Sequence, residues 1–247
     1  MILENTSIYV ISRRNAEYRR ANTDIQMKTA NLDFHYFDAL PADELSKDYH
    51  AALHKTKFLA CNGRPHQLTE VACFASHREL WRLCARQNRN FFVLEDDFSF
   101  IDETLPTLPV IAKLPDSFQY IRLEGTKRKP ARRIKTTTNV ELVRYLKIPQ
   151  RTTGYRITPG GAKALLEKSQ SIYLPVDVFV RQVHIHEVGI YGLRKPVIGH
   201  SGNSIPSDIG DRKKVRGPAW ARATRIAYKT SSAIYNGVRQ IMLEIGR

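Results

Sequence analysis

The chain has 247 residues, 42% of them hydrophobic, which suffices for one large or two small globular domains. Its net charge of +15 favours anionic partners: phosphates, nucleic acid or an anionic membrane surface. The three cysteines form no CxxC pair, and no stretch reaches the roughly 18 apolar residues of a membrane span or the pattern of a signal peptide. We therefore expect a cytoplasmic protein with reduced thiols, without a disulfide framework or a standard zinc motif.

The most informative feature is an apolar run, Phe91–Leu94, followed directly by Glu95, Asp96 and Asp97. Buried parallel strands are near-continuous apolar runs, and ligands of open α/β sheets bind where such strands end. Adjacent carboxylates repel one another unless a cation offsets their charge, and oxygen ligands suit Mg²⁺ or Mn²⁺. The stretch indicates a site for a metal ion and a phosphate or, alternatively, a solvated turn after a strand.

At the start of the chain, residues 7–12 are β-branched and aromatic, and an Arg-rich segment, residues 14–30, follows. This pattern predicts a strand and a helix, and the end of such a strand faces a ligand crevice. Arg13, Arg19 and Arg20 stand there, so they either contact the phosphates or base of a nucleotide or are solvated.

After a predicted strand at residues 32–37, the segment from residue 38 to residue 67 has no clear pattern. Thr69 is the predicted N-cap of a helix that ends near residue 87. One face of this helix combines apolar and polar groups: Cys73, His77, Leu80, Trp81 and Cys84. We expect this face to pack in the core, with His77 as a hydrogen-bonded core histidine.

Beyond the acid cluster, residues 119–123 predict a strand that ends at Glu124, so a second carboxylate lies at a strand end. Residues 122–151 are strongly basic and suit an anionic substrate or solvent equally well. Residues 152–157 predict another strand, and Thr158 followed by Pro159 marks the start of a helix.

Asp177 stands at the start of a further predicted helix, residues 176–189, where plain N-capping would explain it. Short strands at residues 190–193 and 197–198 and a polar loop at residues 200–210 follow. The last segment, residues 211–247, carries nine Lys or Arg against two acids, with apolar residues at near-helical spacing. We predict a basic amphipathic helical tail outside a domain of residues 1–210, and we favour an anionic membrane surface over the domain as its partner.

Two segments in tandem resemble motifs of glycosyltransferase family 25, whose members include bacterial lipooligosaccharide galactosyltransferases and animal collagen galactosyltransferases. Leu68–His77 with Trp81 is similar to the family's LTxGExGCxLSHxxxW motif, and Leu94–Asp97 matches its LEDD at the expected distance. The chain departs from the pattern at Ala72, where the family has glycine. Weaker similarities follow the family's order at Ile8–Ile11 with Arg19-Arg20, Thr153–Tyr155 before Gly161-Ala162, Pro175–Asp177 and Asn203–Ile205.

The resemblance implies a single α/β domain of the GT-A-like type, with a Rossmann-type nucleotide-sugar site and a mixed central sheet. It implies transfer of a hexose, with galactose favoured, from a UDP-hexose to a hydroxyl of lipopolysaccharide, lipooligosaccharide or a related glycan. The transfer would proceed with inversion, with Mn²⁺ or Mg²⁺ as cofactor, and no nucleic acid is expected as a partner. The basic tail suits a peripheral position on the cytoplasmic face of the inner membrane.

The resemblance also suggests roles for individual residues. The metal ion would be held by Glu95, Asp97 and His200. The donor would contact Arg13, Arg19, Arg20, Glu95, Asp96, Thr153, Gly154 and Tyr155. The base that takes the acceptor proton would be Asp177 or Glu124, because both acids are predicted at element ends that face the crevice.

Two other function classes fit the residues alone. A metal-dependent phosphohydrolase or nuclease also uses acid clusters and positive charge, although two-metal sites need more scattered acids than the sequence offers. A non-enzymatic protein that binds nucleic acid or a membrane surface would need only the basic segments, and its binding would weaken steeply with salt.

Overall fold

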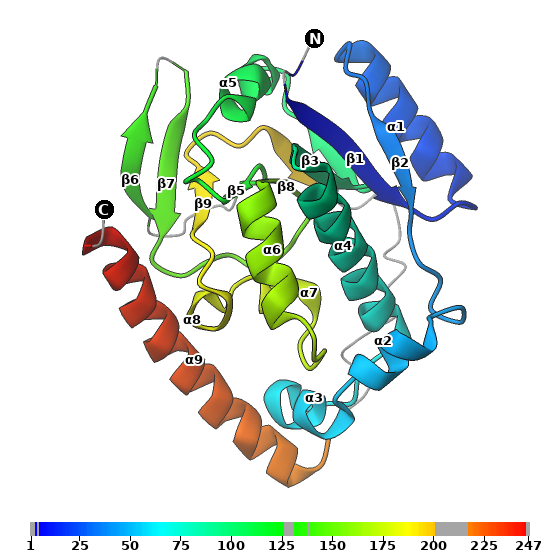
Figure 1. The fold of residues 1–247 in the computed structure, drawn as a ribbon, viewed down its shortest axis with the longest axis vertical. Helices are drawn as coiled ribbons and strands as arrows, with labels where there is room; N and C mark the ends of the chain where they lie inside the picture. Colours follow the sequence, from blue (N-terminus) through cyan, green and yellow to red (C-terminus); the bar gives the residue numbers. More distant parts are fainter. Residues whose placement is uncertain (1–2, 4, 126–130, 138, 201–216, 246–247) are drawn as a thin grey trace.

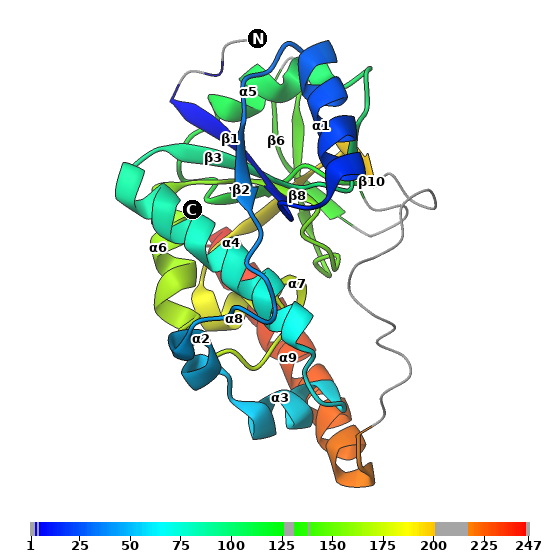
Figure 2. The same ribbon diagram turned by 90° about the vertical axis from the view of Figure 1, so that its right-hand side faces the viewer.

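The computed structural model describes residues 3, 5–125, 131–137, 139–200 and 217–245, which form one α/β domain around a mixed eight-stranded sheet (Figures 1 and 2). This arrangement confirms the predicted α/β class, the mixed central sheet and the C-terminal helix. The predicted boundary at residue 210 and the similarity at Asn203–Ile205 lie outside the described residues, so the division into residues 1–210 and 211–247 stays a prediction.

The sheet combines parallel and antiparallel pairs. Its strand order is β2 (His35–Asp38), β1 (Thr6–Ser12), β3 (Asn90–Glu95), β8 (Gly154–Ile157), β5 (Tyr120–Arg122), β9 (Ile190–Leu193), β7 (Glu141–Tyr145) and β6 (Ala131–Thr136). Strand β1 is parallel to β2 and β3, whereas β8 is antiparallel to both β3 and β5. The carboxyl ends of β2, β1 and β3 therefore meet at one edge, beside the start of β8. A separate ribbon pairs β4 (Phe98–Phe100) with β10 (Ile198–His200).

Helices cover both faces of the sheet (Figure 2). They are α1 (Glu17–Thr29), α2 (Lys47–Ala52), α3 (Lys55–Asn62), α4 (Leu68–Gln87), α5 (Leu108–Ala112), α6 (Pro159–Lys168), α7 (Val176–Phe179), α8 (Val183–His186) and α9 (Ala219–Ile245), with a 3-10 turn at Leu105–Thr107. The short helices α2 and α3 occupy the segment in which the sequence shows no clear pattern. Helix α6 begins as predicted, with the Thr158 side chain accepting a hydrogen bond from the N–H of Gly161.

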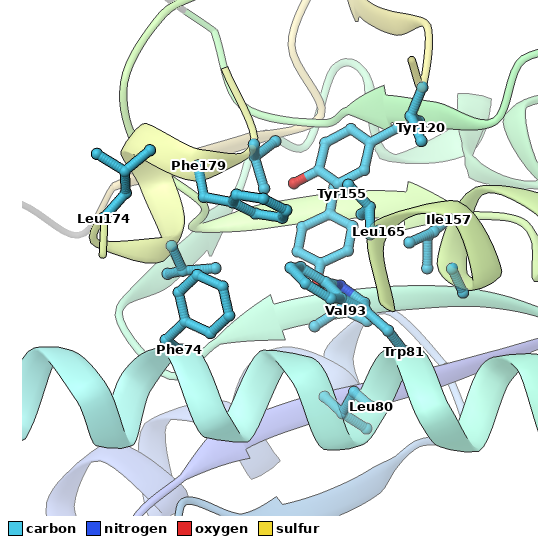
Figure 3. Close-up of a cluster of buried hydrophobic side chains, with 14 of the residues drawn as sticks. Phe74, Leu80, Trp81, Val93, Tyr120, Tyr155, Ile157, Leu165, Leu174 and Phe179 are labelled. Atoms are coloured by element: carbon cyan, nitrogen blue, oxygen red, sulfur yellow. The ribbon is translucent and has the colours of Figure 1, made fainter. Parts of the chain in front are cut away.

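The apolar run of β3 contributes to a core on each face of the sheet, because successive side chains of a strand point to opposite sides. Phe92 and Leu94 join the core that includes side chains of α1 and α5, and Phe91 and Val93 join the core that includes side chains of α4 and α6. Figure 3 shows the second core, in which Trp81 of α4 lies close to Tyr155 of β8. The acids that follow β3 are thus placed by a strand that is buried on both faces.

Helix α4 begins one residue before the predicted N-cap Thr69, and Gln67 occupies the N-cap position instead. The N–H of Gln67 donates to Oε2 of Glu70 (3.3 Å), and Arg64 binds both oxygens of the same carboxylate (2.6 and 2.8 Å). A buried acid in the first turn also interacts favourably with the helix dipole. Glu70 therefore determines where the helix starts.

The helix predicted over residues 176–189 is instead two short helices, α7 and α8. Side chains bind the carbonyl groups near the break: Nε2 of Gln182 donates to Val178 O (3.0 Å), and Nε2 of His186 contacts Val180 O (3.0 Å). These side chains replace backbone bonds of a continuous helix, and that replacement makes the break stable.

Helix α9 runs along the domain from α3 toward the β6–β7 edge (Figure 1) and packs on α3 and α8. Its packed face is largely polar: Thr224 Oγ1 donates to Ala60 O (3.0 Å), and Asn236 Oδ1 contacts Nδ1 of His184 (2.9 Å). The large apolar side chains are exposed instead: Trp220, Ile226, Ile234, Tyr235, Val238, Ile241 and Met242. In the part of the chain that the structure describes, no helix has both the length and the apolar character needed to cross a bilayer.

Candidate active site

Asp96 joins the carboxyl ends of β1 and β3. Its N–H donates to Ile11 O (3.1 Å), and its carboxylate accepts hydrogen bonds from Ser12 Oγ (2.7 Å) and from the Arg19 guanidinium (2.8 Å). The Asp96 and Arg19 side chains are only 10% and 14% exposed, so solvent screens this ion pair weakly. The pair orients the carboxylate and offsets one of the three clustered negative charges.

Glu95 is oriented by three residues from two other parts of the chain. Its N–H donates to Thr153 O (2.8 Å), and its Oε1 accepts a hydrogen bond from Thr152 Oγ1 (2.5 Å). The same oxygen lies 3.1 Å from Nε2 of His77, which belongs to α4. The Glu95 carboxylate is therefore held in one orientation before any ligand binds, as a preorganised site requires.

A chain of hydrogen bonds connects Glu95 with the core. Nδ1 of His77 lies 2.9 Å from the Tyr155 hydroxyl, whose oxygen accepts a hydrogen bond from Nε1 of Trp81 (3.0 Å). The Glu95 carboxylate is an acceptor, so a neutral His77 carries its proton at Nε2 and donates it to Glu95. Nδ1 of His77 then accepts the proton of the Tyr155 hydroxyl. Trp81, Tyr155, His77 and Glu95 thus form one directed chain from the core to the acid cluster.

The structure confirms that His77 is a buried, hydrogen-bonded histidine, but sequence reasoning missed that its partner is the acid cluster. A signal was present, because His77 and Trp81 stand four residues apart and so lie on one face of the helix. The pattern did not indicate which strands this face would meet, since that depends on the packing of α4 on the sheet.

Asp97 completes the cluster. Burial raises the pKa of Asp97 to about 7, with repulsion from Glu95 and Asp96 adding to the rise and Arg19 opposing it. An aspartate side chain ordinarily ionises near pH ~4. So much negative charge in one partly buried place favours the binding of a cation.

The predicted nucleotide-binding arginines have different surroundings. Arg19 belongs to the acid cluster, and Arg13 is exposed just after β1. Arg20 forms an ion pair with Asp38 at the end of β2, and Arg14 binds the same carboxylate (2.7 Å). Their hydrogen bonds lower the pKa of the Asp38 carboxyl, with that of Arg20 the stronger cause. Asp38 is a fourth acid at this edge of the sheet, one that sequence reasoning did not single out.

Glu124 follows β5 and lies within electrostatic range of the cluster. It is buried, bridges by its backbone to Ile198 and forms an ion pair with Arg122. Burial raises the pKa of the Glu124 carboxyl and the charge of Glu95 raises it further, whereas Arg122 and Thr153 oppose the rise. Of the two candidate bases, Glu124 is the one that interacts with the acid cluster.

Residues 153–155, predicted to contact the donor, are all buried. A Cβ at Gly154 would overlap Cδ1 of Ile198 and lie 2.7 Å from Cδ2 of Leu94, so glycine allows these side chains to pack against β8. Tyr155 has no exposed surface, and its side chain acts on the site through His77.

Asp177 has its contacts elsewhere. It is not the N-cap of α7, because the helix begins at Val176 and Pro175 occupies the capping position. Nε2 of Gln150 donates to Oδ2 of Asp177 (2.8 Å), and the carboxylate attracts the guanidinium of Arg181. Asp177 therefore belongs to a basic region beside α9.

Of the predicted metal ligands, Glu95 and Asp97 lie in the acid cluster, whereas only the backbone of His200 is described. His200 pairs with Phe98 in the β4–β10 ribbon, so its backbone is next to Asp97 in the register, while its side chain lies outside the described residues. Among the described side chains, Cys73, His77 and Glu95 offer ligand atoms within 4.8 Å of one another. This second set shares Glu95 with the predicted one, and a metal there would replace the hydrogen bond between Glu95 and His77.

Comparison with known proteins identifies the family of the chain. The family profile described as glycosyltransferase family 25 (LPS biosynthesis protein) matches residues 5–180, which include α4, β3 and the acid cluster. A protein of Anopheles gambiae named glycosyltransferase 25 family member is 28% identical over 240 residues, covering 92% of this chain and 37% of that protein. The chain thus spans little more than a third of the length of this relative. Because the profile covers more than half of the sequence, the chain belongs to glycosyltransferase family 25, a family of enzymes.

Proposed function

We propose that the protein transfers a hexose, with galactose favoured, from a UDP-hexose to a hydroxyl of lipopolysaccharide, lipooligosaccharide or a related glycan, with inversion at the anomeric carbon. The observation that carries the proposal is the oriented acid cluster Glu95–Asp97 at the carboxyl ends of β1 and β3. In a GT-A-like interpretation of the sheet, this edge receives the donor nucleotide. Family membership supports the class of reaction.

A divalent ion, Mn²⁺ or Mg²⁺, fits the chemistry of the cluster. Carboxylate oxygens are the ligands that these ions prefer, and a double positive charge would relieve the repulsion that helps to raise the pKa of Asp97. Glu95 and Asp97 would hold the ion, with His200 as a further ligand. When bound, the ion would offset the charge that develops on the leaving diphosphate.

The donor would lie along the carboxyl ends of β2, β1 and β3. Arg13 and Arg19 would supply positive charge for its phosphates, and Asp96 would keep Arg19 in place. The other predicted donor contacts would act mainly by supporting the site. Arg20 holds Asp38, and Thr153 holds Glu95. Gly154 allows the strands to pack, and Tyr155 holds His77.

Glu124 is the proposed general base. Its raised pKa makes the carboxylate a stronger proton acceptor than an exposed glutamate, and the ion pair with Arg122 keeps it ionised. The carboxylate would take the proton of the acceptor hydroxyl as that oxygen attacks the anomeric carbon and the bond from this carbon to the diphosphate breaks. Asp177 remains the alternative base.

We also propose that the exposed apolar stripe of α9 rests on an anionic membrane surface, which would place the enzyme beside a lipid-linked acceptor on the cytoplasmic face of the inner membrane. The orientation of α9 supports this proposal, because its polar face packs on the domain and its large apolar side chains are exposed. Helices with an apolar face and a basic character bind at the headgroup boundary of bilayers.

Thermal unfolding with and without Mn²⁺ tests donor binding. We expect UDP-galactose with Mn²⁺ to raise the Tm by about 5 °C at saturating concentration, because a ligand that binds only the folded state stabilises it. Asp97→Asn should remove the part of the shift that depends on Mn²⁺, and Asp102→Asn, which changes an exposed acid outside the cluster, should retain it. If no UDP-hexose shifts the Tm with either metal ion, the proposed function is wrong.

A comparison of two variants tests the base. Glu124→Gln should keep the Tm shift with UDP-galactose but slow sugar transfer to purified lipopolysaccharide by roughly 10²–10⁴-fold, the usual contribution of a general base. Asp177→Asn should transfer at nearly the normal rate. The reverse result would assign the proton transfer to Asp177.

A further inference from the structure

A pocket of about 560 Å³ lies between α9 and the rest of the domain. Its walls come from α3, the segment 146–150, the α7–α8 segment and the inner face of α9. Sites for small ligands have volumes of about 300–1,000 Å³, so this pocket is large enough for a substituted sugar. None of the acids of the cluster lines it.

The pocket is strongly basic. Four of its cationic side chains come from three segments: Lys147, Arg181, Arg225 and Lys229. Burial lowers the pKa of the Lys229 ammonium, and the positive charges of Arg225, Arg181 and Lys147 lower it further, so the four charges act on one region. Among the described residues, none of the four forms an ion pair within 4.0 Å, although Asp177 attracts Arg181 from nearby. The pocket thus holds more positive charge than its own acids offset.

Polar side chains line the pocket beside these cations, among them Gln150, Tyr228 and Ser232. The hydroxyl groups of Tyr228 and Ser232 interact with each other. An anion with several oxygen atoms could bind more than one of the four cations at once.

The pocket is held in place by fixed contacts. Arg225 lies against Gly63, where φ is +71° and a Cβ would be 2.7 Å from Cδ of Arg225, and Nδ2 of Asn236 donates to Oε1 of Gln182 (3.0 Å). These contacts fix both the first and the second half of α9 to the domain. The helix that carries Arg225 and Lys229 is therefore held on the domain before a ligand arrives.

The segment 146–150 connects the pocket with the candidate active site. On one side, Lys147 and Gln150 line the pocket. On the other, the carbonyl of Pro149 accepts a hydrogen bond from Arg122 (3.0 Å), which forms the ion pair with Glu124. A glycan anchored in the pocket would be separated from the proposed base by this one segment.

We propose that this pocket binds a phosphate monoester on a sugar of the acceptor glycan and so selects phosphorylated acceptors, an acceptor role that rests on the proposed function. Guanidinium and ammonium groups are the main phosphate-binding groups of proteins. A phosphate monoester carries up to two negative charges and three strong acceptor oxygens, which match the four cations better than a carboxylate does.

Calorimetric titration of the full chain tests the proposal with four probes: glucose 6-phosphate, glucose, inorganic phosphate and dihexanoyl phosphatidic acid. We expect glucose 6-phosphate to bind most tightly. Arg225→Ala and Lys229→Ala should each weaken its binding about tenfold or more, the effect of one lost charge-assisted hydrogen bond. Arg222→Ala, which removes an exposed cation of the same helix outside the pocket, should change it less than about twofold.

Three results would overturn the proposal: no binding of glucose 6-phosphate at millimolar concentration, equal losses in the Arg222→Ala and Lys229→Ala proteins, or equal or tighter binding of inorganic phosphate or the lipid phosphate. The Tm shift with UDP-galactose and Mn²⁺ should be the same in all three variants and the unchanged chain. That shift reports on the donor site, so its absence would contradict the proposed function while leaving the phosphate titration to decide on the pocket.

Discussion

At the residue scale, Gly154 is a position where packing leaves no room for a side chain. In Gly154→Ala, the new methyl group would meet Leu94 and Ile198, so we expect a loss of about 1–3 kcal/mol of stability, measured by urea unfolding. Gly160→Ala is the matched control, because the nearest atom to its Cβ would be 3.8 Å away. Adding Ile198→Val to Gly154→Ala removes the overlapping Cδ1, so the double variant should lose less than the sum of the two single changes. Additive losses would contradict this account.

Substitution of Tyr155 should affect both ligand binding and stability, because its hydroxyl connects Trp81 with His77. Tyr155→Phe should weaken the binding of UDP with Mn²⁺ about tenfold, since His77 would no longer be oriented toward Glu95, and should lower stability by about 1–3 kcal/mol. The control is Tyr120→Phe: its ring stacks on Tyr155 with centroids 4.4 Å apart, and its buried hydroxyl has no hydrogen-bond partner among the described residues. A lowered Tm with unchanged UDP affinity in Tyr155→Phe would show that the chain serves only the core.

Much of the candidate site could be predicted from local sequence at this scale. An apolar run before three acids predicts a strand that ends in charge, and Phe91–Asp97 has that structure. The partners of these acids could not be predicted, because Ser12, His77 and Thr152 lie far from them in sequence. Their contacts depend on how β1, α4 and the residues before β8 meet at one edge of the sheet.

At the scale of elements, the break between α7 and α8 should make stability depend on pH. His186 accepts a hydrogen bond from Val188 N (3.1 Å) at Nδ1 and contacts Val180 O at Nε2, so it is neutral, and burial lowers its pKa to about 4. In the unfolded chain the pKa is about 6.5, so between these values the unfolded state binds more protons.

The His186 contribution is therefore complete above pH ~6.5 and is lost as the pH falls toward ~4. We expect it to remove about 2 kcal/mol from the free energy of unfolding between pH 7 and pH 5, measured by urea unfolding at each pH. Carboxyl groups also titrate in this range, so the control is His186→Gln, in which the pH dependence should be shallower by that amount. Equal slopes in both proteins would contradict a neutral His186.

Element boundaries were predictable where one local signal decides them. The Thr158-Pro159 pair predicts the start of α6, because a capping hydroxyl and a preset φ act within one turn. The start of α4 and the α7–α8 break were not predictable in this way. Both depend on side-chain contacts made only after the segments pack: Arg64 with Glu70, and His186 with Val180.

At the scale of the whole molecule, the exposed stripe of α9 and the net charge of +15 together predict association with anionic membranes. Sedimentation with vesicles that contain phosphatidylglycerol should show binding that falls as salt rises from 50 to 500 mM. The double change Ile234→Glu with Val238→Glu should reduce binding at least about tenfold without lowering the Tm, since both side chains are exposed.

The control for membrane association is Ile25→Glu, which changes an exposed apolar residue of α1 outside the stripe and should bind as the unchanged chain does. If the change in α9 leaves vesicle binding intact, the stripe does not contact membranes. Binding that persists at high salt would instead indicate that apolar burial dominates over charge.

The sequence by itself determined the features that depend on neighbouring residues: the α/β class, the long helix α4, the buried strand β3 with its acids, and an amphipathic tail. Tertiary structure decided what these features face. It brought His77 and Arg19 to the acids, gave Asp177 and Glu124 different partners, and turned the polar face of α9 inward to enclose a basic pocket. The physical reason is that periodicity identifies an amphipathic face, whereas its partner is selected by contacts between residues distant in sequence.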